Sequence, residues 1–302
     1  MTSPANAERD YGIRPPGYRL PDDTRVGAVR LQVSDLARSR DFYERILGLR
    51  TVSSAGGRAT LAPHGDDAAL VHLVERSGAR AARARGHLGL FHFAILLPNR
   101  GALGRLLVHL GEAGVHIGAS DHLVSEALYL SDPDGLGIEV YADRPRSAWQ
   151  SKDRELAMST LPLDAEDLVR AAGGEPWSGM PRGTVMGHVH LHVGDIARAS
   201  AFYHEALGLD RMVWSYPGAL FLSAGGYHHH LGVNTWAGAG ATAPAEDEAQ
   251  MLEWELVMPT ADAVAAASTS LTSAGHGADE EAGGSLFRDP WDTAVRLRDA
   301  TA

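Results

Sequence analysis

An internal duplication is the feature that most constrains the fold of this chain. The segment RLQVSDLARSRDFYERILGL, residues 30–49, returns as HLHVGDIARASAFYHEALGL at residues 190–209. Both copies combine an alternating strand pattern, an Asp suited to cap a helix, and an amphipathic helix pattern that carries Phe-Tyr. Gly48 suits the left-handed stop that follows a helix. The chain is therefore built from repeated strand–helix modules.

Two further modules follow the same plan. The segment FHFAILLPNRGALGRLLVHLGEAG, residues 91–114, again predicts a strand, a turn and a helix closed by Gly. It leads into two short strands around an Asp-Pro-Asp-Gly turn, and a related pattern, SLFRDPWDTAVRLRD, closes the chain at residues 285–299. The four modules begin near Val26, Leu90, Met186 and Glu253. Each module predicts one βαβββ unit, so the expected fold class is α+β.

A segment rich in Pro, Gly and charged residues separates the second unit from the third. It carries one short helical pattern, DAEDLVRAAG. Such a segment is typical of a domain boundary. We therefore expect an N-terminal arm over residues 1–24, a first domain over 25–144, a linker over 145–183 and a second domain over 184–302.

Composition and charge exclude several classes of function. The formal net charge is −11 and no block of Lys or Arg occurs, so nucleic acid is not an expected partner. No apolar run approaches the roughly 20 residues that a membrane span needs, and the N-terminal arm lacks the apolar core of a signal peptide. We therefore expect a cytoplasmic protein without membrane attachment. Because Cys is absent, thiol catalysis is excluded and any metal must be held by His, Asp, Glu or Tyr.

The repeated motifs resemble a known family. Four βαβββ units with FY…LGL after the first strand and DPDG…E near the end look like the vicinal-oxygen-chelate superfamily, which is glyoxalase/dioxygenase-like. Within it, the chain is most similar to two-domain extradiol dioxygenases of the catechol 2,3-dioxygenase type. The resemblance covers about residues 25–299 and implies two vicinal-oxygen-chelate domains.

The resemblance also implies a metal site. A non-haem Fe(II) oxygenase uses two His and one carboxylate on one face of the metal. The positions of these ligands in the family are occupied here by His92, Glu139 and His188. The corresponding positions of the other two units carry Glu253, Arg296 and Ala28. Strand alternation independently places the three candidate ligands on the face opposite to their apolar neighbours.

Three acid–base residues beside the metal follow from the same resemblance, namely His122, Tyr129 and His229. His229 belongs to a triplet in the segment GGYHHHLGVNTW, which reads as a short apolar strand. The family spacing favours His229, whereas alternation along a strand leaves His230 as an alternative. A structural cluster of histidines bonded to loop carbonyls is the other interpretation of the triplet.

These residues imply an Fe(II)-dependent dioxygenase, with Mn(II) as the alternative metal, that cleaves a small aromatic diol with O2. A glyoxalase-like isomerase or lyase is a second interpretation, but the segment 228–234 lacks the second carboxylate ligand usual in glyoxalases. A non-enzymatic protein that sequesters an aromatic drug is a third, and it would have no use for a complete ligand triad.

The distribution of the candidate ligands predicts how the units pair. The second unit carries two of them and the third unit carries the other, so these two units must face each other. We expect this pairing within one chain, because the linker tethers the two units directly. A site shared across a two-fold dimer is the alternative, and the sequence leaves the oligomeric state open.

Overall fold

The computed structural model describes residues 11–281 and 284–300, and its principal strands form two eight-stranded sheets. We name the first the 1–4 sheet, because it combines the first and fourth units in the order β16-β17-β18-β15-β1-β4-β3-β2. Its strands are β1 (Arg25–Val33), β2 (Arg50–Ala55), β3 (Arg58–Ala62), β4 (Val71–Glu75), β15 (Gln250–Met258), β16 (Ala278–Glu281), β17 (Gly284–Arg288) and β18 (Ala294–Asp299).

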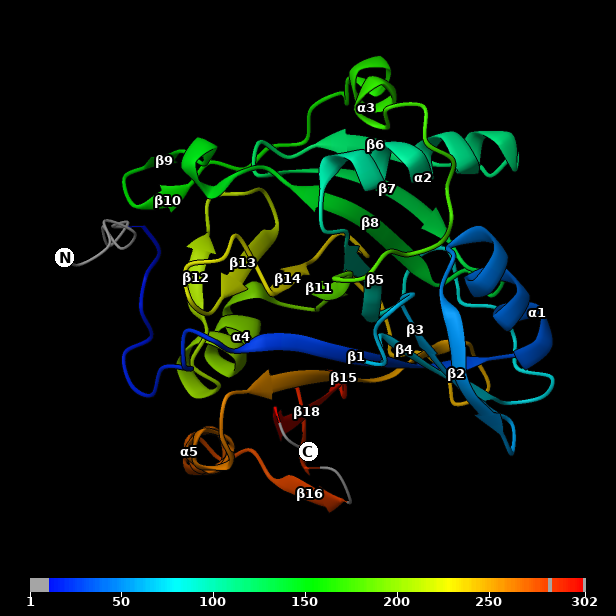
Figure 1. The fold of residues 1–302 in the computed structure, drawn as a ribbon. Helices are drawn as coiled ribbons and strands as arrows, with labels where there is room; N and C mark the ends of the chain where they lie inside the picture. Colours follow the sequence, from blue (N-terminus) through cyan, green and yellow to red (C-terminus); the bar gives the residue numbers. More distant parts are fainter. Residues whose placement is uncertain (1–10, 282–283, 301–302) are drawn as a thin grey trace.

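The second sheet, named the 2–3 sheet, combines the second and third units. Its order is β12-β13-β14-β11-β5-β8-β7-β6. Its strands are β5 (Gly89–Leu96), β6 (Gly118–Asp121), β7 (Ser125–Ser131), β8 (Gly137–Asp143), β11 (Val185–His192), β12 (Asp210–Val213), β13 (Ala219–Ser223) and β14 (Leu231–Asn234). Figure 1 shows the central strands of the two sheets, β5 with β11 and β1 with β15, near the middle of the molecule.

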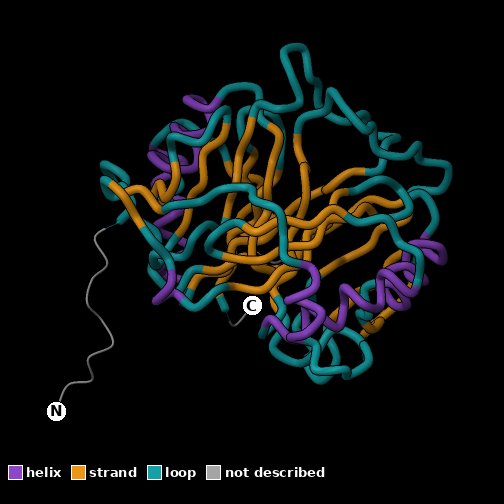
Figure 2. Tube along the Cα trace, turned by 90° about the horizontal axis from the view of Figure 1, so that it is seen from above, coloured by secondary structure: helices purple, strands orange, loops and turns teal. Residues whose placement is uncertain are grey.

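Helices lie around the outside of the sheets, and Figure 2 shows them at the periphery of the strands. They are α1 (Leu36–Asp41), η1 (Phe42–Ile46), α2 (Arg100–Glu112), η2 (Arg146–Ala148), α3 (Ala165–Ala171), α4 (Ile196–Ser200), η3 (Ala201–Ala206) and α5 (Ala261–Ser273). A small hairpin of β9 (Ser151–Lys152) and β10 (Glu155–Leu156) belongs to the linker. Among the described helices, none is long and apolar enough to cross a membrane.

The pairing of the units agrees with the expectation from the ligand positions. Strand β5 of the second unit pairs with β11 of the third, and β1 of the first unit pairs with β15 of the fourth, all within one chain. Each sheet therefore takes one unit from each half of the sequence. The expected domains, residues 25–144 and 184–302, follow the duplication in the sequence. Each sheet, in contrast, contains strands from both of these ranges.

The duplicated segments fold in the same way. Asp35 and Asp195 cap their helices by accepting hydrogen bonds from the amides of Arg38 and Arg198. Gly48 has a φ of 78°, the left-handed stop that the sequence predicts. The helices differ from the expected regular pattern in their second half, where η1 and η3 are π-helical. A π-turn adds one residue, which is too small a change in period for the sequence pattern to reveal.

The Phe-Tyr motif joins the two sheets. The hydroxyl of Tyr43 in the first unit donates to Asp132 of the second at 3.2 Å, and that of Tyr203 in the third donates to Asp289 of the fourth at 3.0 Å. All four side chains are buried. The Asp at the start of each DP turn also accepts two backbone amides of its own turn, so the motif fixes the turn and the sheet packing together.

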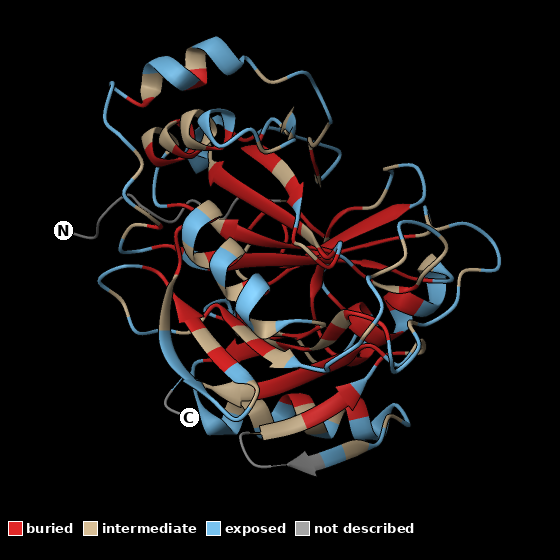
Figure 3. Ribbon diagram, turned by 90° about the vertical axis from the view of Figure 1, so that its right-hand side faces the viewer, coloured by how far each residue is buried: buried red, intermediate tan, exposed pale blue. Residues whose placement is uncertain are grey.

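Alternation along the central strands separates an apolar face from a polar face. Side chains such as Leu31, Phe93, Val189 and Trp254 belong to one continuous core that includes both sheets. Burying a side chain of this size stabilises the fold by about 1.5–3 kcal/mol. Figure 3 shows the strands buried and most exposed residues on helices and loops. The polar side chains of the same strands of the 2–3 sheet lie on its other face, where the candidate site is found.

Candidate metal centre

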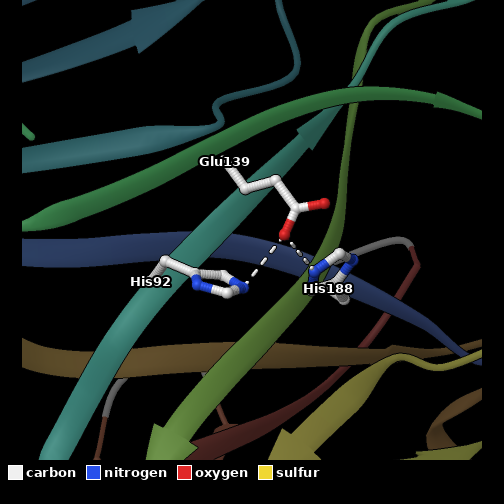
Figure 4. Close-up of side chains that lie close together, drawn as sticks. All are labelled: His92, Glu139 and His188. Carbon is white, nitrogen blue, oxygen red and sulfur yellow. Dashed lines mark hydrogen bonds and ion pairs between the residues drawn. The ribbon is translucent and has the colours of Figure 1, made fainter. Parts of the chain in front are cut away.

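Three adjacent strands bring the candidate ligands together. Strand β5 lies between β11 and β8, and the register places Ala94 opposite both His188 and Glu139. His92 precedes Ala94 by two residues and so projects from the same face. Ala94 is fully buried and short, which leaves space above it. The three longer side chains converge in that region, as Figure 4 shows.

The polar atoms of the three side chains meet at one carboxylate oxygen. Oε2 of Glu139 lies 3.0 Å from Nε2 of His92 and 3.2 Å from Nε2 of His188, and all three residues are buried. At this short distance Nε2 of His92 still makes no well-aligned hydrogen bond. Atoms about 2.1 Å from a shared metal and at right angles to each other would lie about 3 Å apart. The spacing therefore fits the ligand atoms of a cation.

The charges of the cluster also fit a cation. Burial lowers the pKa of His188 to about 4, although Glu139 opposes the shift, so this imidazole is neutral near pH 7. Among the described residues, the ion-pair partners of Glu139 are the two imidazoles, and no Lys or Arg contacts it. A buried carboxylate without a permanent cation is costly. Two imidazoles and a carboxylate are also the ligand set typical of non-haem Fe(II).

A cavity of about 260 Å³ opens beside the cluster, and His92 and Glu139 form part of its wall. The wall also includes all three of the predicted acid–base residues. Aromatic side chains supply much of the remaining surface, and the two at the rim, Phe91 and Trp236, are partly exposed with ring centroids 5.9 Å apart. The cavity therefore offers a small space beside the cluster with a largely aromatic wall.

His122 and Tyr129 act as a bonded pair on this wall. Nδ1 of His122 lies 2.7 Å from the carbonyl oxygen of Ser159, so this nitrogen carries the proton. In the tautomer with its proton on Nδ1, Nε2 accepts from the Tyr129 hydroxyl, also at 2.7 Å. Burial, followed by the negative charge of Glu139, raises the pKa of Tyr129 well above its ordinary value. The phenol thus stays protonated.

The histidine triplet divides between the cavity and the interior. His229 lines the cavity, and its ring centroid lies 4.0 Å from that of His188. Nδ1 of His230 instead lies 3.0 Å from Oγ of Ser223 and accepts from a backbone amide. His228 is fully buried behind His229.

The interpretation of the triplet as part of a strand is wrong. Strand β14 begins at Leu231, and the triplet lies in the turn before it. Gly225 and Gly226, with φ of 61° and 64°, make that turn tight. Alternation of side chains therefore does not apply to His228, His229 and His230.

Several residues of the cavity wall were not predicted from the sequence. The linker contributes Met158, Ser159 and Thr160, and Thr160 bonds to the hydroxyl of Tyr216 at 3.0 Å. These residues carry no motif, and they reach the cavity because the linker runs beside the edge strand β6, where Leu161 bridges to Asp121. His190 is another wall residue, and its position two residues after His188 could have indicated it.

Comparison with known families agrees with this architecture. The model of the Glyoxalase/Bleomycin resistance protein/Dioxygenase superfamily matches residues 25–140 and 185–296. The chain therefore belongs to this superfamily. The resemblance and the α+β fold class expected from the sequence are confirmed.

Individual relatives narrow the comparison. Catechol-2,3-dioxygenase of Bacillus subtilis (strain 168) is 42% identical over 273 residues, which cover 89% of this chain and 95% of that protein. A putative dioxygenase from Bacillus subtilis subsp. subtilis str. 168 has a similar structure, with a TM-score of 0.64 and 14% identity over 94% of this chain and 87% of its own. Glyoxalase I from Zea mays has a TM-score of 0.57 and 17% identity over 92% of this chain and 93% of its own. At these identities the two structures bear on the fold alone.

Proposed function

We propose that this protein is an Fe(II)-dependent extradiol dioxygenase that opens the ring of a catechol-like diol with O2. The observation that carries the proposal is the convergence of two imidazoles and one buried carboxylate beside a cavity of about 260 Å³. The 42% identity to a protein named Catechol-2,3-dioxygenase supports the same reaction.

His92, Glu139 and His188 would hold the metal. When bound, Fe(II) supplies Lewis acidity that favours the deprotonated form of a substrate oxygen, together with open positions where substrate and O2 can meet. Mn(II) accepts the same types of ligand, so the metal is part of the test.

His229 is the acid–base residue of the proposed reaction. Burial, followed by the nearby His188, lowers the pKa of His229 well below its ordinary value, so the ring is neutral and can accept a proton. It lies on the cavity wall against the ring of His188. From there it would take the proton of one ring hydroxyl and return it to an oxygen after the ring opens.

Tyr129 and His122 orient the substrate. The Tyr129 hydroxyl donates to His122, which leaves its oxygen lone pairs free to accept from a substrate hydroxyl. The partly exposed rings of Phe91 and Trp236, which meet edge to face at the cavity, would contact the substrate ring and shield the reacting atoms from water. These contacts select a flat ring with adjacent oxygens.

The test combines metal analysis with turnover. Protein reconstituted without air with Fe(II) or Mn(II) is mixed with catechol and O2, and the yellow ring-opened product of the 2-hydroxymuconic semialdehyde type is followed by absorbance. We expect one O2 consumed for each ring opened, and the more active metal identifies the cofactor. Metal-loaded protein that leaves catechol intact, or that binds an aromatic compound tightly without metal, contradicts the proposal.

A further inference from the structure

Two residues behind His229 have no part in the proposed reaction. The Nδ1 atoms of His228 and His229 lie 2.7 Å apart, and Nε2 of His228 lies 2.9 Å from Oδ1 of Asp143. The side chain of Asp143 is 26% exposed, whereas His228 is fully buried. A chain of hydrogen bonds therefore runs from the edge of the protein to an imidazole on the cavity wall.

The protons of this chain can be assigned one by one. An ionised carboxylate only accepts hydrogen bonds, so Nε2 of His228 carries the proton that it donates to Asp143. In the tautomer with its one proton on Nε2, Nδ1 of His228 accepts. Nδ1 of His229 must then donate, and its Nε2 keeps a free lone pair. Among the described residues, Nε2 of His229 has no hydrogen-bond partner.

Packing holds the middle of the chain in place. The ring of His228 lies against Tyr227, with centroids 4.1 Å apart, and against Trp149 at 5.4 Å. The Tyr227 hydroxyl lies 3.2 Å from Asp143 and 2.6 Å from the Tyr141 hydroxyl. Asp143 thus receives two donors, and neither its carboxylate nor the ring of His228 is free to turn.

We propose that His228 and Asp143 are positioning residues that fix the tautomer of His229, so that Nε2 presents a lone pair to the cavity. The proposal rests on the proposed function only in that His229 accepts a substrate proton. The other tautomer would present an N–H to a substrate hydroxyl, where an acceptor is required. The three histidines then have different roles. His229 contacts the substrate, His228 orients His229, and His230 bonds the turn to β13 through Ser223.

The tautomer can be measured in the metal-free, full-length protein. Long-range proton–nitrogen correlation spectra of protein with isotope-labelled histidine distinguish the two tautomers, and the His229 signals are those missing from His229→Gln. We expect the proton on Nδ1 in the wild type and in the control His230→Asn. Asp143→Leu leaves Nε2 of His228 without its acceptor, so the proton of that ring is no longer fixed and the Nε2–H tautomer of His229 should appear. A wild-type proton on Nε2, or an unchanged spectrum in Asp143→Leu, overturns the proposal.

Kinetics of the metal-loaded protein separate positioning from a general structural role. We expect Asp143→Leu to lower kcat by about 10²-fold or more while KM and metal content stay unchanged. Asp143→Glu, which keeps the carboxylate, should recover most of the rate. Loss of metal, or a raised KM with the wild-type kcat, indicates a structural role and contradicts the proposal.

The positioning pair and the proposed function fail in different ways. If loaded wild-type protein leaves catechol intact while the tautomer of His229 still responds to Asp143→Leu, the proposed function is wrong and the positioning pair stands. If ring cleavage proceeds and the tautomer does not respond, the positioning pair is wrong and the proposed function stands.

Discussion

Glu139 of the 2–3 sheet and Arg296 of the 1–4 sheet occupy equivalent positions, each on a strand parallel to the central strand of its own sheet. Glu139 lies between two imidazoles. Arg296 instead makes two bonds, of 3.0 and 2.7 Å, to the carboxylate of Glu253, which holds the position of His92. Ala28 fills the remaining position. One scaffold thus carries two different buried polar clusters.

The difference lies in where the positive charge comes from. In the 1–4 sheet the chain supplies its own cation, and Arg30 adds a second contact to Glu253 at 3.3 Å. A fixed guanidinium against the carboxylate satisfies it and repels a divalent ion. In the 2–3 sheet no such group contacts Glu139 among the described residues, so its compensation must come from outside the chain.

Removing a candidate ligand should have the largest effect. We expect His92→Ala, His188→Ala and Glu139→Gln each to abolish metal binding and ring cleavage and to leave a folded protein, because a triad that loses one member no longer holds the ion. Metal content by mass spectrometry and circular dichroism check this. As the matched control, Glu253→Gln in the other sheet should keep its metal. Full metal occupancy in any of the three variants removes that residue from the site.

Breaking the ion pair should affect stability and not chemistry. Among the described residues, Arg296→Met leaves the half-exposed Arg30 as the ion-pair partner of the buried carboxylate of Glu253, so we expect the free energy of unfolding to fall by about 3–5 kcal/mol. Urea unfolding measures the loss. The double variant Glu253→Leu/Arg296→Met removes both charges and should recover most of it. If the double variant is no more stable than Arg296→Met alone, the pair is not the source of the effect.

Within the 2–3 sheet, substitutions of the acid–base residues should differ in effect from substitutions of the metal ligands. We expect His229→Ala and Tyr129→Phe to keep the metal and to lower kcat by roughly 10²-fold. His230→Ala is the control, because its side chain bonds to Ser223 and does not line the cavity. Steady-state kinetics with metal analysis decide the matter, and a larger loss in His230→Ala than in His229→Ala reverses the assignment.

Acid should weaken the metal-free protein through its buried histidines. Burial lowers the pKa of His188 to about 4 and that of His230 to about 3. The unfolded chain, with ordinary pKa values near 6.5, then binds more protons than the folded one, so stability is lost as the pH falls from about 6.5. We expect His230→Asn to reduce the slope by at most about 1.4 kcal/mol per pH unit. Urea unfolding at several pH values measures it, and an unchanged slope rules out His230 as a contributor.

Much of the fold could be predicted because its signals are local. The duplication, the helix caps and the closing glycine depend on neighbouring residues, and the structure contains all of them. The resemblance to the family nominated His92, Glu139 and His188, and alternation supported the choice because each lies in a regular strand. The pairing of units followed because only the second and third carry candidate ligands.

The remainder depends on contacts that no local pattern records. The linker residues 158–160 reach the cavity through the path of a long connection, and Trp236 lies in a loop after β14. The orientation of the triplet depends on the turn at Gly225 and Gly226. Because the triplet lies between this turn and the start of β14, its side chains do not alternate between the faces of the sheet. The π-turns of η1 and η3 change the helical period too little to be visible in the sequence.

The second and third units, which form one sheet, lie in the sequence between the first and fourth units, which form the other. This arrangement sets the order in which the two sheets can form during synthesis. His92 and His190, opposed across the centre of the 2–3 sheet, are 98 residues apart, whereas Arg30 and Glu253 of the 1–4 sheet are 223 residues apart. Closing the longer loop costs only about 0.7 kcal/mol more. The larger difference is one of time, because the edge of β1 that pairs with β15 stays without its partner until residues 250–258 have been synthesised, after both central strands of the 2–3 sheet.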